Sequence, residues 1–266
     1  MKILFVLFLT FSISFAKVYY AKVEPYELRN ISSNVSGLVT YANEDLIGKK
    51  LGKKPYIRID SELDRKELMY IEDKLAYLRK IIKVNENVLK NLNTSLEKKR
   101  ENYDKVIGLK FKSSVEKDKE YYDLINSENL NLSTQKEIEN LRIQVTDLKL
   151  RQAQLQRSLK DKNLTAKGFI LYEMLVKPGQ VVGISTPLAK VADISRAKLT
   201  IYLDERDVAN AKSKTILIDS EKTTYKITRV LNIADSKNIS KYMAQIIIPS
   251  PKLFSKLVKI ELINGK

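Results

Sequence analysis

The chain has 266 residues, neither cysteine nor histidine, and a formal net charge of +16. Without cysteine it can form no disulfide, thiol nucleophile or thiolate metal site, and without histidine it lacks the commonest general base and a usual zinc and copper ligand. The charge does not indicate a nucleic-acid partner, because the lysines mostly alternate with glutamate and aspartate, which is typical of a solvated helix face. Anionic lipid head groups or an acidic partner surface are the functional alternatives to a merely lysine-rich composition.

The first element is an apolar run from Ile3 to Ala16 that follows Lys2 and ends in Ser14-Phe15-Ala16. The run is short for a membrane span, and small residues occupy the two positions that a signal peptidase recognises. We therefore predict a cleaved secretory signal over residues 1–16, with an uncleaved membrane anchor as the alternative. Beyond residue 17 the sequence has no apolar run of spanning length, so we expect the mature protein to be soluble outside the cytoplasm.

Two distant segments, Gly37–Gly52 and Gly168–Gly183, share a glycine spacing at a constant offset of 131 positions. Each half is too small to bury a core alone, so we predict that the two close a small sandwich by packing face to face. At Gly48 and Gly179 we expect turns with positive φ or a close backbone approach. The aligned pairs are Gly37 with Gly168, Tyr41 with Tyr172, Gly48 with Gly179, and Gly52 with Gly183.

Between the halves, the region from Tyr56 to Lys177 lacks proline and shows helical periodicity. Ser61 is the expected start of a first helix. Asn85 and Lys99 are polar interruptions of its apolar row, of the kind that fix the register of a coiled coil. The steps of the row alternate between three and four residues, which predicts a partner helix along its whole length. The row is Leu68, Ile71, Leu75, Leu78, Ile82, Asn85, Leu89, Leu92, Leu96, Lys99, Tyr103 and Val106.

A second helix is predicted downstream, with its own row of seam positions. Gly108 is expected to end the first helix in a left-handed cap, and Ser113 or Ser114 to begin the second. The short connection requires antiparallel helices, and about 45 residues give a rod of roughly 65–70 Å. The step from Leu132 to Ile138 is one residue short of a heptad, which predicts a local irregularity. The second row is Tyr121, Ile125, Leu132, Ile138, Leu141, Val145, Leu148, Gln152, Leu155 and Leu159.

The C-terminal third, from Lys198 onward, is rich in β-branched and aromatic runs separated by turns, which predicts antiparallel strands. The N-terminal segment VYYAKVEPYEL is a further strand that could pair with the C-terminal ones. The charged cluster Asp204–Asp207 is interpreted as a turn rather than a catalytic pair, because the sequence places no base, nucleophile or metal ligand beside it.

Together these elements resemble the periplasmic adaptor, or membrane fusion, proteins of tripartite efflux and type I secretion systems, the HlyD-like family. The similarity lies in Val35–Val39, Leu175–Val182, Thr186–Asp193 and Ala197–Asp207. It implies an α+β fold in which a long antiparallel coiled-coil α-hairpin is inserted into a split lipoyl-like β-sandwich, the barrel-sandwich hybrid domain, followed by a small antiparallel β-barrel. The implied domains are a signal peptide (1–16), the split lipoyl-like domain (28–60 plus 163–195), the hairpin (61–162), and a β-barrel domain with a truncated membrane-proximal part (17–27 plus 196–266).

The resemblance also implies where the chain meets its partners. In the family an Arg, a Leu and a Ser at the hairpin tip contact the outer-membrane channel, and the matching positions here are Asn102, Val106 and Ser113, next to Tyr103. Asn102 lacks the guanidinium group of the family pattern, so the alternatives are that nearby Arg100 substitutes for it or that the channel differs from the usual type. The lipoyl-like turns would use Gly37, Gly48, Gly52, Gly168, Gly179 and Gly183. No cofactor is expected, because the helices replace the turn that presents the lysine of true carrier domains.

The implied function is that of a non-enzymatic adaptor in the periplasm, associated with the inner membrane. Its partners would be an inner-membrane transporter of RND or ABC type, a TolC-like outer-membrane channel and further copies of itself in a ring, with no nucleic acid. A periplasmic structural coiled-coil scaffold without a transport role is the alternative. A scaffold would not need the doubled glycine pattern, and an enzyme is the weakest option because the sequence shows no nucleophile, metal or cofactor constellation.

Overall fold

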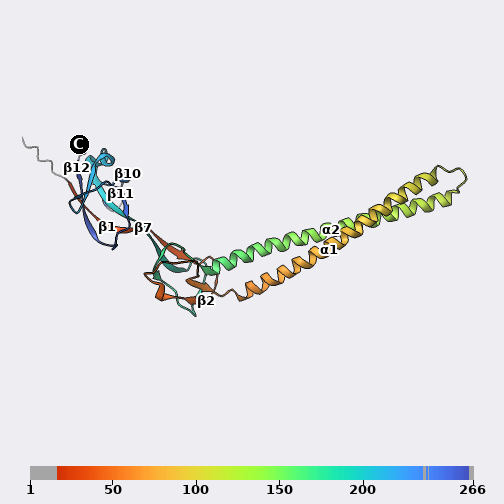
Figure 1. The fold of residues 1–266 in the computed structure, drawn as a ribbon, viewed down its shortest axis with the longest axis horizontal. Coiled ribbons are helices and arrows are strands. Elements are labelled where there is room, and N and C mark those ends of the chain that lie inside the picture. Colours follow the sequence, from red (N-terminus) through yellow and green to blue (C-terminus); the bar gives the residue numbers. More distant parts are fainter. Residues whose placement is uncertain (1–16, 236–237, 239, 264–266) are drawn as a thin grey trace, which may run out of the picture. The chain divides into compact units, whose positions relative to one another are not determined.

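A computed structural model describes residues 17–235, 238 and 240–263, so the predicted signal peptide, residues 1–16, lies outside the described residues. The protein is α+β, with one long helical hairpin and antiparallel sheets (Figure 1). It divides into two compact units, one made of the chain up to Ile57 and from Thr165 onward, the other of Arg58–Leu164. Within the described residues, no helix carries an apolar stretch long enough to cross a membrane.

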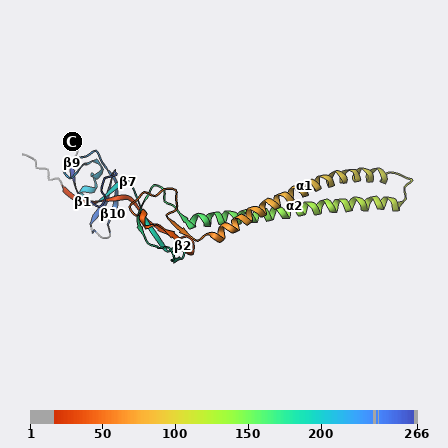
Figure 2. The ribbon, with the colours of Figure 1, turned by 60° about the horizontal axis from the view of Figure 1, so that its bottom comes forward.

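The hairpin consists of α1 (Glu62–Ile107) and α2 (Ser114–Lys162), with 46 and 49 residues. Figure 2 shows the two helices side by side, coiling around each other. At 1.5 Å per residue each is about 70 Å long. The predicted α1 row is confirmed, because every position in it is buried or half-buried while the residues on its other faces are mostly exposed. The best-buried part of the seam contains Ile71, Leu75, Leu78, Leu141, Val145 and Leu155.

The second row is confirmed from Ile138 onward, and upstream only Ile125 is half-buried as predicted. Upstream, Tyr121 and Leu132 are exposed, and the buried positions are Leu124 and Asn131. The spacing from Leu124 through Asn131 to Ile138 is two full heptads, so the predicted irregularity is wrong. Apolar periodicity did not reveal this register, because polar residues, Asn131 among them, fill the seam between Leu124 and Ile138.

Asn131 is the main polar contact within the hairpin. Its side-chain amide donates to Asn93 Oδ1 of α1 at 2.6 Å and its carbonyl accepts from Gln135 Nε2 at 2.9 Å. Asn131 is only 4% exposed, so its amide needs these partners. A buried asparagine of this kind favours one register at some cost in stability. Asn85 and Lys99, to which the spacing assigns that role, are half-buried in the seam, whereas the Asn93–Asn131 pair is not predicted by the spacing.

The two helix ends at the connection are capped differently. Gly108 ends α1 with φ −75° and ψ −14°, which is right-handed, so the predicted left-handed cap is wrong. Ser113 begins α2 as predicted and forms a capping box with Glu116, in which each side chain bonds the other's backbone N–H. Lys117 Nζ donates to the carbonyl oxygen of Ile107 at 3.1 Å. This cation supplies a partner that a left-handed glycine cap would otherwise provide.

The β-unit is organised around two long antiparallel strands, β1 (Lys17–Ser32) and β7 (Pro187–Asp204). They belong to an eight-stranded sheet of order β10-β11-β7-β1-β12-β8-β9, to which β5 adds beside β7; a four-stranded sheet has the order β4-β3-β2-β6. The remaining bounds are β2 Gly37–Ala42, β3 Ile57–Ile59, β4 Asn163–Leu164, β5 Ile170–Met174, β6 Val181–Val182, α3 Glu205–Val208, β8 Thr215–Ile218, β9 Glu221–Lys222, β10 Ile227–Ala234, β11 Lys241–Pro249 and β12 Leu257–Ile263. Short 3₁₀ turns lie at Glu44–Leu46 and Ala211–Ser213.

The N-terminal strand pairs with the C-terminal one, as the sequence predicts. Lys17 lies opposite Leu262 and Lys22 opposite Leu257 in the β1–β12 ladder. Alternate residues of the strands point to one side, because side chains of a strand alternate between faces. Their buried members form one apolar core, which includes Tyr19, Ala21, Val23, Leu199, Ile201, Leu203, Ile246, Val258, Ile260 and Leu262.

The two glycine-marked segments are hydrogen-bonded to each other in a reciprocal pattern. In one direction, Gly48 N donates to Leu171 O at 2.8 Å and Leu171 N donates to Lys49 O at 3.2 Å. In the other, Gly179 N donates to Val39 O and Val39 N donates to Gln180 O, both at 2.8 Å. The turn of each half therefore pairs with the strand of the other, which explains why the sequence carries the pattern twice.

The repeated glycines do not all have the same role. Gly48, Gly168 and Gly179 lie in turns with φ of +78°, +95° and +91°. Gly37 is the first residue of β2 and pairs with Val182, so it is a strand residue rather than a turn residue. Gly52 and Gly183 lie in loops without positive φ.

Gly179→Ala should lower the free energy of unfolding by about 1–2 kcal/mol, because a left-handed conformation is strained for any residue with a Cβ. The space around the missing Cβ is open, so the cost comes from φ alone. Gly52→Ala is the matched control: it also has open space but no positive φ, and should change stability by less than about 0.5 kcal/mol. Urea denaturation followed by tyrosine fluorescence measures both, and equal effects would contradict this account of Gly179.

Candidate docking site at the hairpin tip

The hairpin tip exposes apolar side chains among lysines. Phe111, in the connection, is 79% exposed, Val115 at the start of α2 is 75% exposed, and Ile107 at the end of α1 is 49% exposed. Lys110 and Lys112 flank Phe111 in the sequence. The connection between the helices is too short to fold back and cover these side chains. Exposed apolar side chains with positive charge around them are suited to contact another protein surface.

Three of the four residues predicted for the tip contact also have contacts within the hairpin, and their contact with a channel stays a prediction. Tyr103 is half-buried and its ring lies 5.9 Å from that of Tyr121, and Val106 is half-buried in the seam. The hydroxyl of Ser113 is held in the capping box. Asn102 is exposed. Phe111 was missed, although an aromatic residue between two lysines in a helical connection is a signal that the sequence does carry.

The charges at the tip are partly neutralised by the cap. Lys112 donates a hydrogen bond to Glu116 at 2.9 Å. This bond makes the largest contribution to lowering the pKa of Glu116 to about 2, and hydrogen bonds from the Ser113 backbone and hydroxyl lower it further. The same hydrogen bond raises the pKa of Lys112. Lys110 forms no ion pair within the described part of the chain, so it carries the unpaired charge beside Phe111.

Arg100, the suggested substitute for the family's arginine, is already engaged across the hairpin. Its guanidinium donates to Glu128 Oε1 from both Nε, at 3.2 Å, and Nη2, at 2.6 Å. This ion pair joins α1 to α2 at least one helical turn before α1 ends at Ile107. Arg100 therefore contributes to the packing of the two helices, and a partner could recruit it only by competing with Glu128.

The acidic cluster at Asp204–Asp207, interpreted from the sequence as a turn, lies at the end of β7 and in the short helix α3, where its side chains form ion pairs. Asp204 pairs with Lys17 and with Lys241, and Asp207 accepts hydrogen bonds from the Tyr19 hydroxyl at 2.5 Å and from Lys214 at 2.6 Å. Burial, together with the bond to Asp207, raises the pKa of Tyr19. Among the described residues no group of three or more acidic side chains is arranged to hold a metal ion.

Comparison with solved structures decides which architecture this is. MacA from Actinobacillus actinomycetemcomitans superposes with a TM-score of 0.67 at 19% identity, over 93% of this chain and 78% of that one. The membrane fusion protein Spr0693 from Streptococcus pneumoniae R6 superposes with a TM-score of 0.61 at 12% identity, over 94% of this chain and all of the other. The chain has the membrane fusion protein fold.

A third similar structure is a chimera that contains the α-hairpin of another protein. A chimera of MacA that contains the α-hairpin of Pseudomonas aeruginosa MexA is similar to the chain with a TM-score of 0.54 at 15% identity, over 94% of this chain and 82% of the chimera. No protein-family model and no curated protein matches the sequence. The membrane fusion protein fold is thus recognised here from structure, and the resemblance inferred from the sequence is confirmed at that level.

Proposed function

We propose that the protein is a non-enzymatic periplasmic adaptor that bridges an inner-membrane transporter and an outer-membrane channel. The observation that carries the proposal is the exposed apolar tip, centred on Phe111, at the end of a hairpin about 70 Å long. A rod of this length has no catalytic purpose, and its exposed end offers a surface for a partner. The membrane fusion protein fold supports this role in efflux systems generally.

In this proposal, residues 28–60 and 163–195 form the split lipoyl-like domain. The reciprocal hydrogen bonds of Gly48 with Leu171 and of Gly179 with Val39 support the assignment. Residues 17–27 and 196–266 form the β-barrel domain, supported by the β1–β12 ladder. The barrel end would contact the transporter, of RND or ABC type, the tip would contact a TolC-like channel, and several copies would form a ring. An N-terminal signal would direct the chain to the periplasm beside the inner membrane.

Tip docking is tested with Phe111→Asp combined with Val115→Asp. Both side chains are more than 70% exposed, so the fold should tolerate the change, whereas Val106→Asp would damage the helix seam. Burying two carboxylates in an apolar contact should weaken channel binding at least about tenfold. Site-specific crosslinking from the tip to the channel, and export by cells, measure the effect.

The matched control is Leu150→Asp combined with Ile143→Asp. These residues are 62% and 60% exposed on α2, away from the tip. This control should leave crosslinking and export unchanged. Unchanged export and crosslinking in the tip variant would refute docking through the tip.

One observation is compatible with the scaffold alternative as well as with ring assembly. An exposed apolar row on α1, separate from the seam, follows heptad-like steps and offers a surface for lateral association. Ring assembly and a filament-like scaffold would both use it, so electron microscopy of the purified protein distinguishes them: funnel-like rings support the adaptor and rods joined side by side support the scaffold. The row is Tyr70, Tyr77, Ile81, Val84 and Val88.

A further inference from the structure

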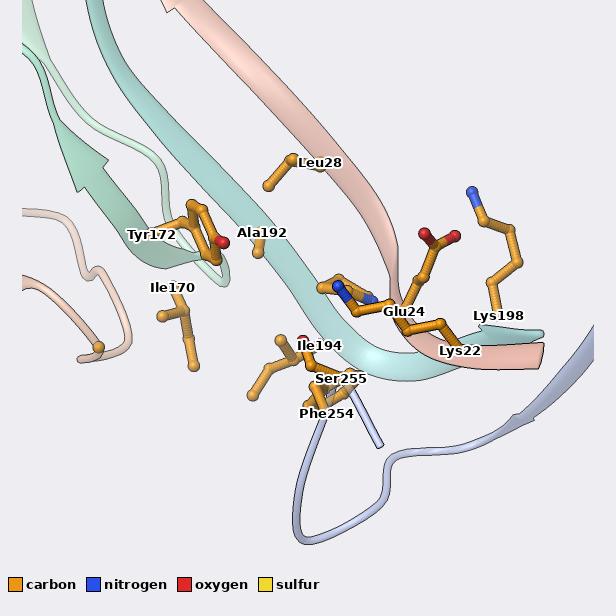
Figure 3. A pocket seen from close by; sticks show the side chains of 12 residues that line it. Lys22, Glu24, Leu28, Ile170, Tyr172, Ala192, Ile194, Lys198, Phe254 and Ser255 are labelled. Carbon is orange, nitrogen blue, oxygen red and sulfur yellow. The ribbon is translucent and has the colours of Figure 1, made fainter. Parts of the chain in front are cut away.

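A cavity of about 440 Å³ opens on the β-unit, between the two long strands and the loop that precedes β12. Figure 3 shows its lining side chains. The volume falls within the range of about 300–1,000 Å³ that is usual for small-molecule sites. The proposed adaptor role does not involve this cavity, and the inference drawn from it stands independently of that role.

The floor of the cavity is an apolar row that crosses three adjacent strands. Leu28 of β1 lies opposite Ala192 of β7, and Ile170 of β5 lies opposite the same alanine on its other side. Ala192 is small, which leaves a depression between its two larger neighbours. Leu28 is 53% exposed, so this surface is available to a ligand.

The wall is built by Phe254 and Ser255 and is fixed to β1 by the backbone. Ser255 N donates to Val23 O at 2.7 Å, and Val23 N donates to Lys256 O at 2.8 Å. Ser255 has a φ of +67°, in the left-handed region, which turns the loop over the strands. These bonds make the wall part of the sheet's own framework, so the site is largely formed before a ligand binds.

The charged residues that line the cavity, Lys22, Glu24 and Lys198, give it a net charge of +1. Glu24 lies opposite Lys198 in the β1–β7 ladder, and Figure 3 shows their side chains extending in the same direction. The Lys22 side chain instead extends along the cavity toward Ile194. Within the described part of the chain Lys22 forms no ion pair, so its ammonium group is available to a ligand.

We propose that this cavity binds a drug-sized anionic amphiphile. The apolar body of the ligand lies on Leu28, Ala192 and Ile170, against Phe254, and its acidic group pairs with Lys22. A single soluble molecule suits the site better than a bilayer surface, because the apolar floor is recessed behind the loop wall rather than presented at a projecting edge.

The test uses two fluorescent probes with the same ring system. One is 8-anilinonaphthalene-1-sulfonate, which is anionic, and the other is N-phenyl-1-naphthylamine, which lacks the sulfonate. The full chain should bind both saturably and the anionic probe more tightly. Lys22→Gln should raise the Kd of the anionic probe about two- to fivefold and leave that of the neutral probe unchanged.

Leu28→Glu places a carboxylate on the floor and should weaken both probes about tenfold or more. Val181→Glu is the matched control, because Val181 is 79% exposed on β6 and does not line the cavity. Thermal unfolding checks that Leu28→Glu folds, and if it does not, Lys22→Gln decides alone. Equal effects of the two glutamates, or no effect of Lys22→Gln, would overturn the proposal. So would cosedimentation with phosphatidylglycerol vesicles that depends on Lys22, since it would identify a bilayer surface as the ligand.

Discussion

Leu171→Ala should lower the free energy of unfolding of the β-unit by about 3 kcal/mol, within the range of 2–5 kcal/mol for buried leucines. Leu171 is fully buried in β5, and its backbone joins the second glycine-marked half to the turn of the first. Truncation removes apolar contacts and leaves a cavity that the paired strands on either side cannot easily close. Urea denaturation followed by tyrosine fluorescence measures the shift in midpoint.

The matched control is Leu38→Ala on β2. Leu38 is 43% exposed and belongs to the strand that carries the reciprocal hydrogen bonds of the first half. It should change stability by less than about 0.5 kcal/mol. Equal losses of unfolding free energy in Leu171→Ala and Leu38→Ala would contradict the structure, which indicates that the shared core of the two halves is a main source of stability.

Asp207→Ala should destabilise the β-unit by about 3 kcal/mol, the lower end of the cost of breaking a buried ion pair. Asp207 is the shared acceptor for Tyr19 and Lys214, whose side chains are themselves mostly buried. Its removal leaves a hydroxyl and an ammonium group without their partner. Glu205→Ala, two positions away in α3 and exposed, is the control and should have little effect. A denaturation midpoint for Asp207→Ala equal to that of Glu205→Ala would contradict the structural role of the cluster.

The Asp207 carboxylate should also make the stability of the protein depend on pH in the acidic range. Burial by itself would raise the pKa of Asp207, but hydrogen bonds from Lys214 and Tyr19 and the charges of Lys214 and Lys17 lower the pKa below the usual 3.8. The pKa of Asp207 is lower in the folded state than in the unfolded state. Its contribution to the free energy of unfolding is therefore fully present above the unfolded-state pKa and is lost as the pH falls through the folded-state pKa. Denaturation midpoints of the wild type and Asp207→Ala should therefore converge below about pH 4, and a constant difference down to pH 2 would contradict this assignment.

Part of the candidate site could be predicted from the sequence. The capping role of Ser113 follows from its place three residues before Glu116. The place of Tyr103 and Val106 in the α1 seam also follows from spacing, yet the family pattern assigned both to the channel contact. Phe111 escaped notice because its signal, an aromatic residue between two lysines in a connection, is not a periodic pattern. Nor could the cavity at Lys22 be predicted, since it depends on Leu28, Ala192 and Ile170 meeting from strands far apart in the chain.

The sequence by itself determined the helical hairpin, because a seam of three- and four-residue steps specifies two paired helices and the short connection between them requires that they run antiparallel. It also determined that two distant glycine-marked halves are related, since positive φ at Gly48 and Gly179 is a local demand that only certain residues meet. Only the tertiary structure decided which polar residues fill the seam near the hairpin connection, such as Asn131. It also decided that each half's turn pairs with the other's strand, and which charges are buried. Those outcomes depend on contacts between segments distant in the chain, and such contacts leave no fixed spacing in the sequence.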